Sequence, residues 1–250
     1  MTVRAVTVDF WNTLVREPPG LLARMRRDAV VAAVAQLGAA ISTAEIDTAL
    51  SAASEAHSRA WSNGRIHLPQ DGARRFAEHL ADGRLRADET ARLARAFLSS
   101  SSGAALPIAD GAAPALRELR DGGARLAIVC DVGLTPSPIL RDVLDRAGLL
   151  ALFDAWAFSD EVGQYKPAPQ IFDHALRALG VAAADATHVG DLRRTDVAGA
   201  RAIGMRSVRY RGIADDRTAV PDADHVIDDW RELPALVYAQ IAVAARKSAV

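Results

Sequence analysis

The sequence contains a single cysteine, Cys130, among its 250 residues. A disulfide within the chain is therefore impossible, and zinc sites built on pairs of cysteines are excluded. Long apolar runs are also missing, since no stretch reaches the ~20 residues that a membrane helix needs. The apolar residues near the N-terminus are too few for a signal peptide and have no small-residue cleavage site after them. We therefore expect a cytoplasmic protein that does not bind membranes.

Charge of one sign is not in excess, because 30 Lys and Arg residues face 31 Asp and Glu residues and the net charge is -1. A basic surface for nucleic acid and an acidic disordered tail are both disfavoured by this balance. Half of the residues are apolar, which is enough for a sizeable core. The composition favours a soluble globular protein that acts on a small molecule, either as a monomer or as a homodimer.

Residues 21 to about 98 show apolar side chains at spacings of three and four, the period of a helix, and no convincing strand. Pro18 and Pro19 precede this block, and a stretch rich in serine and glycine follows it at residues 99–103. These breaks predict an inserted all-helical domain over residues 17–103.

In the remainder of the chain, strand patterns alternate with helix patterns. The expected strands cover residues 3–8, 126–130, 155–158, 187–189 and 206–210. The expected helices cover residues 113–120, 138–147, 169–179 and 196–203, and a glycine follows each within two residues. This alternation predicts an α/β fold in which residues 1–16 and 104–250 form a Rossmann-like, doubly wound parallel sheet. Ligands of such sheets bind at the carboxyl ends of the strands.

Carboxylates follow two of the expected strands. Asp9 ends the first, and Asp191 and Asp196 lie in the segment GDLRRTD. Taken singly, Asp191 is a turn residue and Asp196 a helix N-cap. Taken together, three like charges at one edge of the sheet repel strongly unless a cation lies among them. A few carboxylates together with a substrate phosphate are typical of Mg²⁺ sites.

Asp9 is the natural nucleophile of such a site. A carboxylate that attacks phosphorus gives an aspartyl-phosphate, which divides one difficult hydrolysis into two easier steps. Lys166 lies in YKPAPQIF, just before a helix that begins with proline. Its charge, with that of Mg²⁺, would offset the repulsion between nucleophile and phosphoryl oxygens.

The motifs DFWNTL (residues 9–14), YKPAPQIF (165–172) and HVGDLRRTDVAGARAIGM (188–205) occur in this order. Together they resemble the haloacid dehalogenase (HAD) superfamily, and the insertion is placed like a C1-type helical cap. The resemblance implies that Asp9 is the nucleophile, that Thr13 supports the first motif and that Lys166 steadies the phosphoryl group. It also implies that Mg²⁺ is held by Asp9, Asp191, Asp196 and the backbone carbonyl of Trp11.

Two positions depart from the family pattern. HAD phosphatases usually carry a second Asp, the general acid and base, where this chain has Trp11, and an indole does not ionise in the useful range. Such proton transfer contributes typically 10²- to 10⁴-fold. A Ser or Thr that binds phosphate is replaced by Cys130, followed by Asp131. We assign substrate binding to Cys130, Asp131, Lys166 and His67, the last from a polar loop of the helical block.

Three functions are compatible with these motifs. In the first, the protein is a phosphatase whose missing acid comes from Asp131, His67 or Asp71. In the second, it resembles a 2-haloacid dehalogenase, which also has an aromatic residue at the Trp11 position but lacks the paired metal-binding acids. In the third, it binds a phosphorylated ligand without turnover. The intact GDLRRTD motif favours the first, a Mg²⁺-dependent phosphatase of a small phosphorylated metabolite.

Overall fold

The computed structural model describes residues 5–238, and these residues form two compact units. The core unit contains residues 5–16, 106–131 and 144–238, and the helical unit contains residues 17–105 and 132–143. Residues 132–143, which the sequence pattern placed with the core, thus cluster with the helices. Residues 1–4 and 239–250 were assigned to the core domain, residues 3 and 4 to its first strand, and all lie outside the described residues.

The core unit is built on a six-stranded sheet in the order β3-β2-β1-β4-β5-β6, with every pairing parallel. The strands are β1 (Ala5–Val8), β2 (Arg125–Cys130), β3 (Ala155–Phe158), β4 (Ala186–Gly190), β5 (Arg206–Tyr210) and β6 (His225–Ile227). Val8, the last residue of β1, is in register with Ile128 and with Val189. The carboxyl ends of β2, β1 and β4 therefore lie next to one another.

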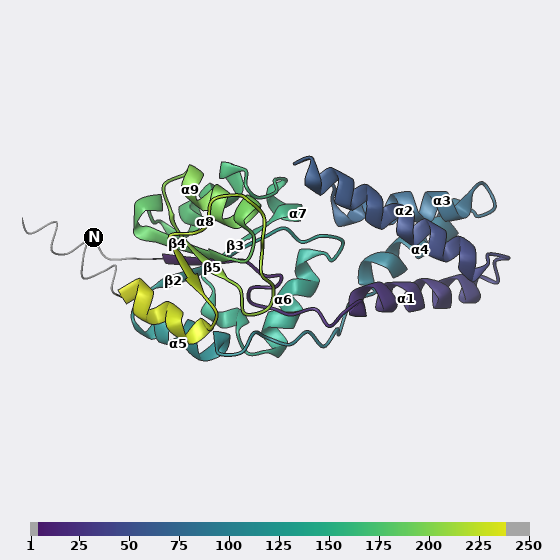
Figure 1. Ribbon diagram of the computed structural model, residues 1–250. Helices are drawn as coiled ribbons and strands as arrows, with labels where there is room; N and C mark the ends of the chain where they lie inside the picture. Colours follow the sequence, from purple (N-terminus) through teal and green to yellow (C-terminus); the bar gives the residue numbers. More distant parts are fainter. Residues whose placement is uncertain (1–4, 239–250) are drawn as a thin grey trace, which may run out of the picture. The chain divides into compact units, whose positions relative to one another are not determined.

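Helices cover both faces of this sheet, as a doubly wound fold requires, and the predicted fold class is confirmed. Figure 1 shows α8 and α9 on one side of the sheet and α5 on the other. The helices are α5 (Ala112–Asp121), α6 (Ser137–Arg146), α7 (Ser159–Val162), α8 (Pro169–Leu179) and α9 (Ala198–Ala202). Single turns occur at Leu150–Leu152, Ala183–Asp185 and Trp230–Glu232, and a π-helical turn at Arg193–Val197 precedes α9.

Strands β1, β2 and β3 read as nearly continuous apolar runs because both of their faces are buried. All four residues of β1 and five of the six residues of β2 are buried. Helix α8 packs its apolar face, which includes Ile171, Phe172 and Leu179, against alanine and valine side chains of the sheet. This packing fixes the strand ends that carry the polar residues described below.

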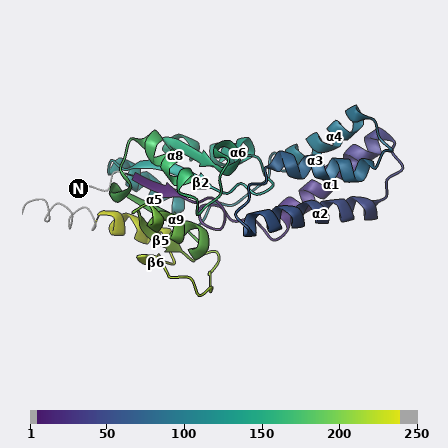
Figure 2. The ribbon, with the colours of Figure 1, turned by 90° about the horizontal axis from the view of Figure 1, so that it is seen from above.

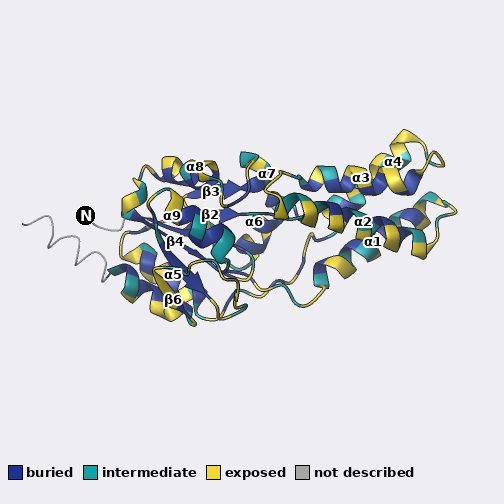
Figure 3. Cartoon of the chain, turned by 45° about the horizontal axis from the view of Figure 1, so that its top comes forward, coloured by how far each residue is buried: buried dark blue, intermediate teal, exposed yellow. Residues whose placement is uncertain are grey.

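Residues 17–105 of the helical unit form the helices α1 (Leu21–Leu37), α2 (Thr43–Ser62), α3 (Pro69–Ala81) and α4 (Ala87–Ser99), and residues 137–143 of α6 also belong to this unit. Figure 2 shows α1 to α4 side by side, and contacts join α1 to α2, α2 to α3, α3 to α4 and α4 to α1. Their inward faces form one core that includes Val30, Ile46, Phe76, Leu93 and Phe97. In Figure 3 each helix has a buried stripe and an exposed opposite face, as the three- and four-residue spacing predicts.

Within residues 5–238, none of the helices combines the length and the apolar character that crossing a membrane requires.

Candidate active site

The carboxyl ends of β1 and β4 bring three carboxylates together. Asp9 follows β1, Asp191 follows β4, and Asp196 lies in the π-helical turn after β4. One oxygen of each lies within 4.8 Å of the others, and all three residues are buried. Hard oxygen donors in a small cluster of this kind are the donor set that Mg²⁺ prefers. The residues present therefore fit a divalent cation.

The turn after β1 is held by contacts that fix Asp9. The Asp9 amide donates to the carbonyl of Val189 at 2.8 Å, and the Thr13 hydroxyl donates to Asp9 Oδ2 at 3.1 Å. Asn12 adopts a left-handed conformation with φ 55°, which asparagine tolerates better than most residues. The indole of Trp230, which is completely buried, donates to the carbonyl of Thr13 at 3.0 Å.

Lys166 connects two of the carboxylates. Its ammonium group donates to Asp9 Oδ1 at 2.5 Å and to Asp196 Oδ1 at 2.7 Å. Its backbone amide donates to Asp131 Oδ1 at 3.0 Å, which fixes the segment before α8 to the end of β2. Burial alone would lower the pKa of Lys166, but the charges of Asp196 and Asp9 outweigh it and raise the pKa well above its usual value. Lys166 is thus a permanent cation in the site.

Asp196 is the best-satisfied carboxylate of the three. Besides Lys166, His188 Nε2 lies 3.0 Å from Oδ1, and the Leu192 amide donates to Oδ2 at 3.0 Å. Burial alone would raise its pKa, yet the charge of Lys166 and the contact with His188 keep the pKa below its ordinary value. Gly190 permits this geometry, since a Cβ there would lie 2.2 Å from the Asp196 carboxyl carbon.

His188 extends the polar network into the sheet. Its Nδ1 lies 2.8 Å from the Thr7 hydroxyl of the neighbouring strand, so both ring nitrogens have partners. The link from His188 to Asp196 was not anticipated from the sequence. The sequence pointed to Thr7 only in that it is a polar residue inside an apolar strand. No local sequence pattern pointed to the contact between Trp230 and Thr13.

Asp9 and Asp191 are less fully compensated than Asp196, because burial outweighs the effect of Lys166 on their pKa values. Burial raises the pKa of Asp9 to about 7, although Lys166 acts against this rise. Burial, followed by the charge of Asp9, raises the pKa of Asp191 to about 9. Among residues 5–238, no side chain donates a hydrogen bond to Asp191. Two buried carboxylates with raised pKa values next to each other would be stabilised in their charged forms by a cation between them.

The residues that depart from the family pattern also lie in the core unit. Trp11 is partly buried, and its ring centroid lies 4.9 Å from that of Phe10 in an edge-on contact. The Cys130 side chain is completely buried, and burial raises the pKa of its thiol. The thiol is therefore neutral and sealed in the core at the end of β2. Asp131, the next residue, is partly exposed.

His67 belongs to the helical unit. Its ring centroid lies 5.8 Å from that of His57 on α2. Asp71, a second residue of the same polar loop, accepts a hydrogen bond from the Leu68 amide at 3.1 Å and so caps the start of α3. The fold thus brings Asp9, Thr13, Lys166, Asp191 and Asp196 together in the core unit, whereas His67 lies in the other unit.

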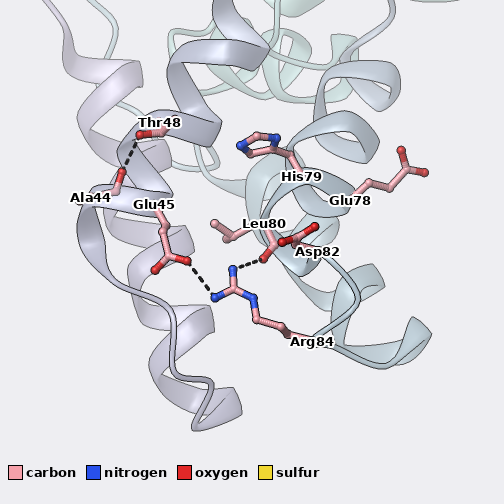
Figure 4. A pocket seen from close by; sticks show the side chains of 8 residues that line it. All are labelled: Ala44, Glu45, Thr48, Glu78, His79, Leu80, Asp82 and Arg84. Carbon is pink, nitrogen blue, oxygen red and sulfur yellow. Dashed lines mark hydrogen bonds and ion pairs between the residues drawn. The ribbon is translucent and has the colours of Figure 1, made fainter.

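A pocket of about 440 Å³ lies on the helical unit between α2 and the end of α3 (Figure 4). Arg84 forms an ion pair with Glu45 at 2.8 Å and donates to the Leu80 carbonyl at 3.2 Å. The Thr48 hydroxyl donates to the Ala44 carbonyl at 2.9 Å. None of the predicted site residues lines this pocket, and these polar groups already have partners.

Comparison with known proteins identifies a family whose model matches most of this chain. Residues 3–204 match the family model of haloacid dehalogenase-like hydrolases. The match covers both motif-bearing strand ends, Lys166 and the whole helical insertion.

Curated relatives align over part of the chain. A stretch of 142 residues is 35% identical to haloacid dehalogenase-like hydrolase domain-containing protein 3 of Bos taurus, covering 55% of each protein. A stretch of 160 residues is 36% identical to a phosphoserine phosphatase of Thermus thermophilus, covering 63% of this chain and 61% of the relative. A ribulose-1,5-bisphosphate 5-phosphatase of Halopiger xanaduensis is 36% identical over 130 residues, covering 49% and 53%. The chain spans about half the length of the first of these relatives.

Solved structures align over nearly the whole chain. A HAD phosphatase from Thermococcus onnurineus is 28% identical with a TM-score of 0.63, covering 94% of this chain and 97% of that one. A 2-haloacid dehalogenase from Pseudomonas syringae is 25% identical with a TM-score of 0.73, covering 96% and 99%. The same fold thus serves two chemistries among these neighbours.

Proposed function

The chain belongs to the haloacid dehalogenase-like hydrolase family, and from this premise we propose that it is a Mg²⁺-dependent phosphatase of a small phosphorylated metabolite. The observation that carries the proposal is the buried cluster of Asp9, Asp191 and Asp196 with Lys166 bound to two of them. Phosphatases among its relatives support the same chemistry. In this proposal the helical unit acts as a C1-type cap.

Asp9 is the proposed nucleophile. A carboxylate oxygen of Asp9 attacks phosphorus, the bond between phosphorus and the ester oxygen breaks, and the phosphoryl group is transferred to Asp9. Attack of water on the phosphorus of this aspartyl-phosphate then releases phosphate and restores Asp9. Thr13 holds the attacking carboxylate by its hydrogen bond to Oδ2. Because Asp9 is buried, few waters compete for its oxygens.

The metal would be held by Asp9, Asp191, Asp196 and the backbone carbonyl of Trp11. When bound, Mg²⁺ supplies positive charge next to the nucleophile and the phosphoryl oxygens. Lys166 has the same electrostatic role from a fixed position, since its ammonium group donates to both Asp9 and Asp196. His188 and the Leu192 amide orient Asp196 and, through it, Lys166.

Proton transfer to the leaving group is the step in which this chain differs. Trp11 has no ionisable group, and the Cys130 thiol is buried with a raised pKa. Asp71 and Asp131 each accept a backbone hydrogen bond at one carboxylate oxygen, from the Leu68 amide and from the Lys166 amide. Asp131, His67 and Asp71 therefore remain our candidates for the proton donor, and Asp131 and His67 are also our candidates for substrate contact.

A panel of phosphate esters tests the proposal. The purified protein should release inorganic phosphate from at least one small ester in the presence of Mg²⁺, and chelation with EDTA should abolish the release. Asp9→Asn should reduce the rate to background while the fold, measured by circular dichroism, is retained. An active Asp9→Asn variant, or phosphate release that EDTA leaves unchanged, would contradict the proposal.

A second candidate function is hydrolysis of a 2-halo acid, in which Asp9 would attack carbon and halide would leave. It is favoured by Trp11 and by the likeness to a 2-haloacid dehalogenase structure. It gives no reason for the raised pKa values of Asp9 and Asp191. Halide release from 2-chloropropionate in the presence of EDTA would support this candidate over the phosphatase.

A further inference from the structure

The β5–β6 loop (residues 211–224) of the core unit is held by arginines of neighbouring segments. Within this loop, which the structure describes completely, no helix or strand forms. Each of its aspartates, Asp215, Asp216, Asp222 and Asp224, accepts a hydrogen bond from a side chain or a backbone amide outside the loop. Ordering an irregular loop costs conformational entropy, which these contacts offset.

Arg209 anchors the loop to the sheet. It lies on β5, and its side chain is 2% exposed. Its guanidinium donates to both oxygens of Asp222, from Nε at 2.7 Å and from Nη2 at 3.0 Å, and to Asp215 at 2.8 Å. The paired contact with Asp222 has the fork geometry that arginine and carboxylate prefer. It lowers the pKa of Asp222 to about 2, so Asp222 is charged at neutral pH.

Arg193 binds the same loop from the metal turn (residues 191–196), which contains two of the three clustered carboxylates. Its Nη2 donates to Asp222 at 2.9 Å, and its Nη1 donates to the Thr218 carbonyl at 2.7 Å. Asp222 is thus shared by Arg193 and Arg209. One carboxylate of the loop therefore joins the metal turn to β5.

Asp216 binds the backbone of the metal turn. The Arg193 amide donates to Asp216 Oδ2 at 2.7 Å, and the Thr218 amide donates to Oδ1 at 2.8 Å. The first amides of a helical turn have no partner within that turn, so Asp216 supplies one from 23 positions away. The preceding amide, that of Leu192, donates to Asp196 at 3.0 Å. Adjacent amides of the metal turn are therefore held by a proposed metal ligand and by the β5–β6 loop.

The metal turn needs support from outside, because its carboxylates are close to a third one and like charges repel. The side chain of Asp196 is held by Lys166 and His188. Among residues 5–238, by contrast, no side chain donates a hydrogen bond to Asp191. The position of Asp191 thus depends on the backbone of the metal turn.

We propose that the β5–β6 loop positions the metal turn through Arg193, and that Asp216 and Asp222 are positioning residues for the metal ligands. Asp216 fixes the backbone at Arg193, and Asp222 fixes the Arg193 side chain. The inference rests on the proposed Mg²⁺-dependent function and deepens it, because it assigns support of the site to residues outside the sequence motifs. Removal of groups that support metal ligands typically costs 10- to 100-fold in metal affinity.

Asp216→Ala tests the proposal by Mg²⁺ binding. The variant releases the Arg193 amide, so calorimetric titration should give a Kd for Mg²⁺ roughly 10- to 100-fold higher than that of the wild type. Asp222→Ala should raise the Kd as well. Because Asp222 is proposed to act through Arg193, Asp222→Ala should change the Kd little in an Arg193→Met background. Additive effects of Asp222→Ala and Arg193→Met on the Kd overturn this route.

Asp224→Ala is the matched control. Asp224 lies on the same loop, but it accepts hydrogen bonds from the Ser207 amide and from Arg201 and none from the described residues of the metal turn. The variant should keep the Kd for Mg²⁺ within about twofold of the wild-type value. An unchanged Kd in Asp216→Ala, or an equal increase in Asp224→Ala, overturns the inference.

Hydrogen exchange keeps this inference separate from the proposed function. In the metal-free protein, Asp216→Ala should speed exchange of the amides of residues 192–196 by about tenfold, whereas Asp224→Ala should leave it unchanged. If this holds while the wild type binds no Mg²⁺ or releases no phosphate, the positioning role stands and the proposed function fails. Unchanged exchange in Asp216→Ala overturns the inference even if the enzyme is active.

Discussion

Lys166 donates a hydrogen bond to Asp196 at 2.7 Å, and fewer than one-twentieth of either side chain is exposed. The two residues lie on different segments, one before α8 and the other in the turn after β4. Their pairing brings together the two motifs that carry the proposed chemistry. It also means that the charge of each depends on the presence of the other.

Lys166→Met should therefore impair both stability and activity. Removal of one partner of a buried ion pair costs about 3–5 kcal/mol, because the remaining charge is left uncompensated. We expect a loss of this size in urea unfolding without metal, and a smaller loss with saturating Mg²⁺, since a bound cation replaces part of the missing charge. Phosphate release should fall by more than about 10²-fold. Equal losses with and without Mg²⁺ would show that the cation does not bind next to Lys166.

The raised pKa values of Asp9 and Asp191 predict how the stability of the metal-free protein depends on pH. Burial raises their pKa values to about 7 and about 9, far above the values of unfolded carboxylates. Between pH 4 and pH 9 the folded, metal-free protein thus binds more protons at these groups than the unfolded chain does. The contribution of these two groups to the free energy of unfolding is therefore complete below pH 4. It is lost as the pH rises through 7 and then through 9.

Mg²⁺ should reverse this dependence of stability on pH, because metal binding displaces the protons of Asp9 and Asp191. The increase in unfolding temperature caused by Mg²⁺ should grow from pH 5 to pH 8, and calorimetry in buffers of different ionisation enthalpy should show proton release. Asp191→Asn is the matched control and should flatten both effects. An Mg²⁺ effect that is independent of pH would contradict the assignment of these acids to the metal.

The lowered pKa of His57 predicts the opposite dependence of stability on pH, in a lower pH range. Its pKa in the folded protein is lowered to about 4 by burial, against 6.5 for the free group. Its contribution to stability is complete above pH 6.5 and is lost as the pH falls towards 4, because only the unfolded chain gains the proton. The loss is at most about 3 kcal/mol and is reduced by partial exposure. His57→Gln should lose less stability than the wild type between pH 6.5 and pH 4 in urea unfolding. An equal loss of stability in His57→Gln and in the wild type would rule out a lowered pKa of His57.

Trp230 is predicted to support Asp9 through Thr13. Trp230→Phe keeps most of the ring but removes the donor to the Thr13 carbonyl, which is left buried without this partner. An unsatisfied buried carbonyl costs about 1–3 kcal/mol, to be measured by urea unfolding. Because the Thr13 hydroxyl holds Asp9, kcat should fall while KM changes little. Tyr210→Phe, another buried aromatic near Trp230, is the control and should retain kcat.

Much of the fold was predictable because glycine-ended helices alternate with buried strands. Strand β6 was missed, since two of its three residues, His225 and Val226, are exposed and carry no strand pattern. The helix expected from residue 196 begins earlier as a π-helical turn, which has no distinct sequence signal. The grouping of residues 132–143 with the helical unit depends on tertiary packing rather than on local pattern.

The candidate site likewise contains residues that the sequence pattern predicted and residues that it did not. Asp9, Asp191 and Lys166 could be named from sequence because they stand where strands or loops end at one edge of a parallel sheet. The support from Trp230 joins residues 217 positions apart, and no local pattern announces such a contact.

Trapping of the covalent intermediate tests the central claim most directly. Because Trp11 cannot act as the base that activates water, hydrolysis of the aspartyl-phosphate should be slow and the phosphoenzyme should accumulate. Intact-protein mass spectrometry after rapid acid quenching of the wild type with Mg²⁺ and a substrate should show the mass of one added phosphoryl group. The added mass should be absent in Asp9→Asn and should decay faster in Trp11→Asp. Phosphate release without any such species in the wild type, or an equal added mass in Asp9→Asn, would contradict the account.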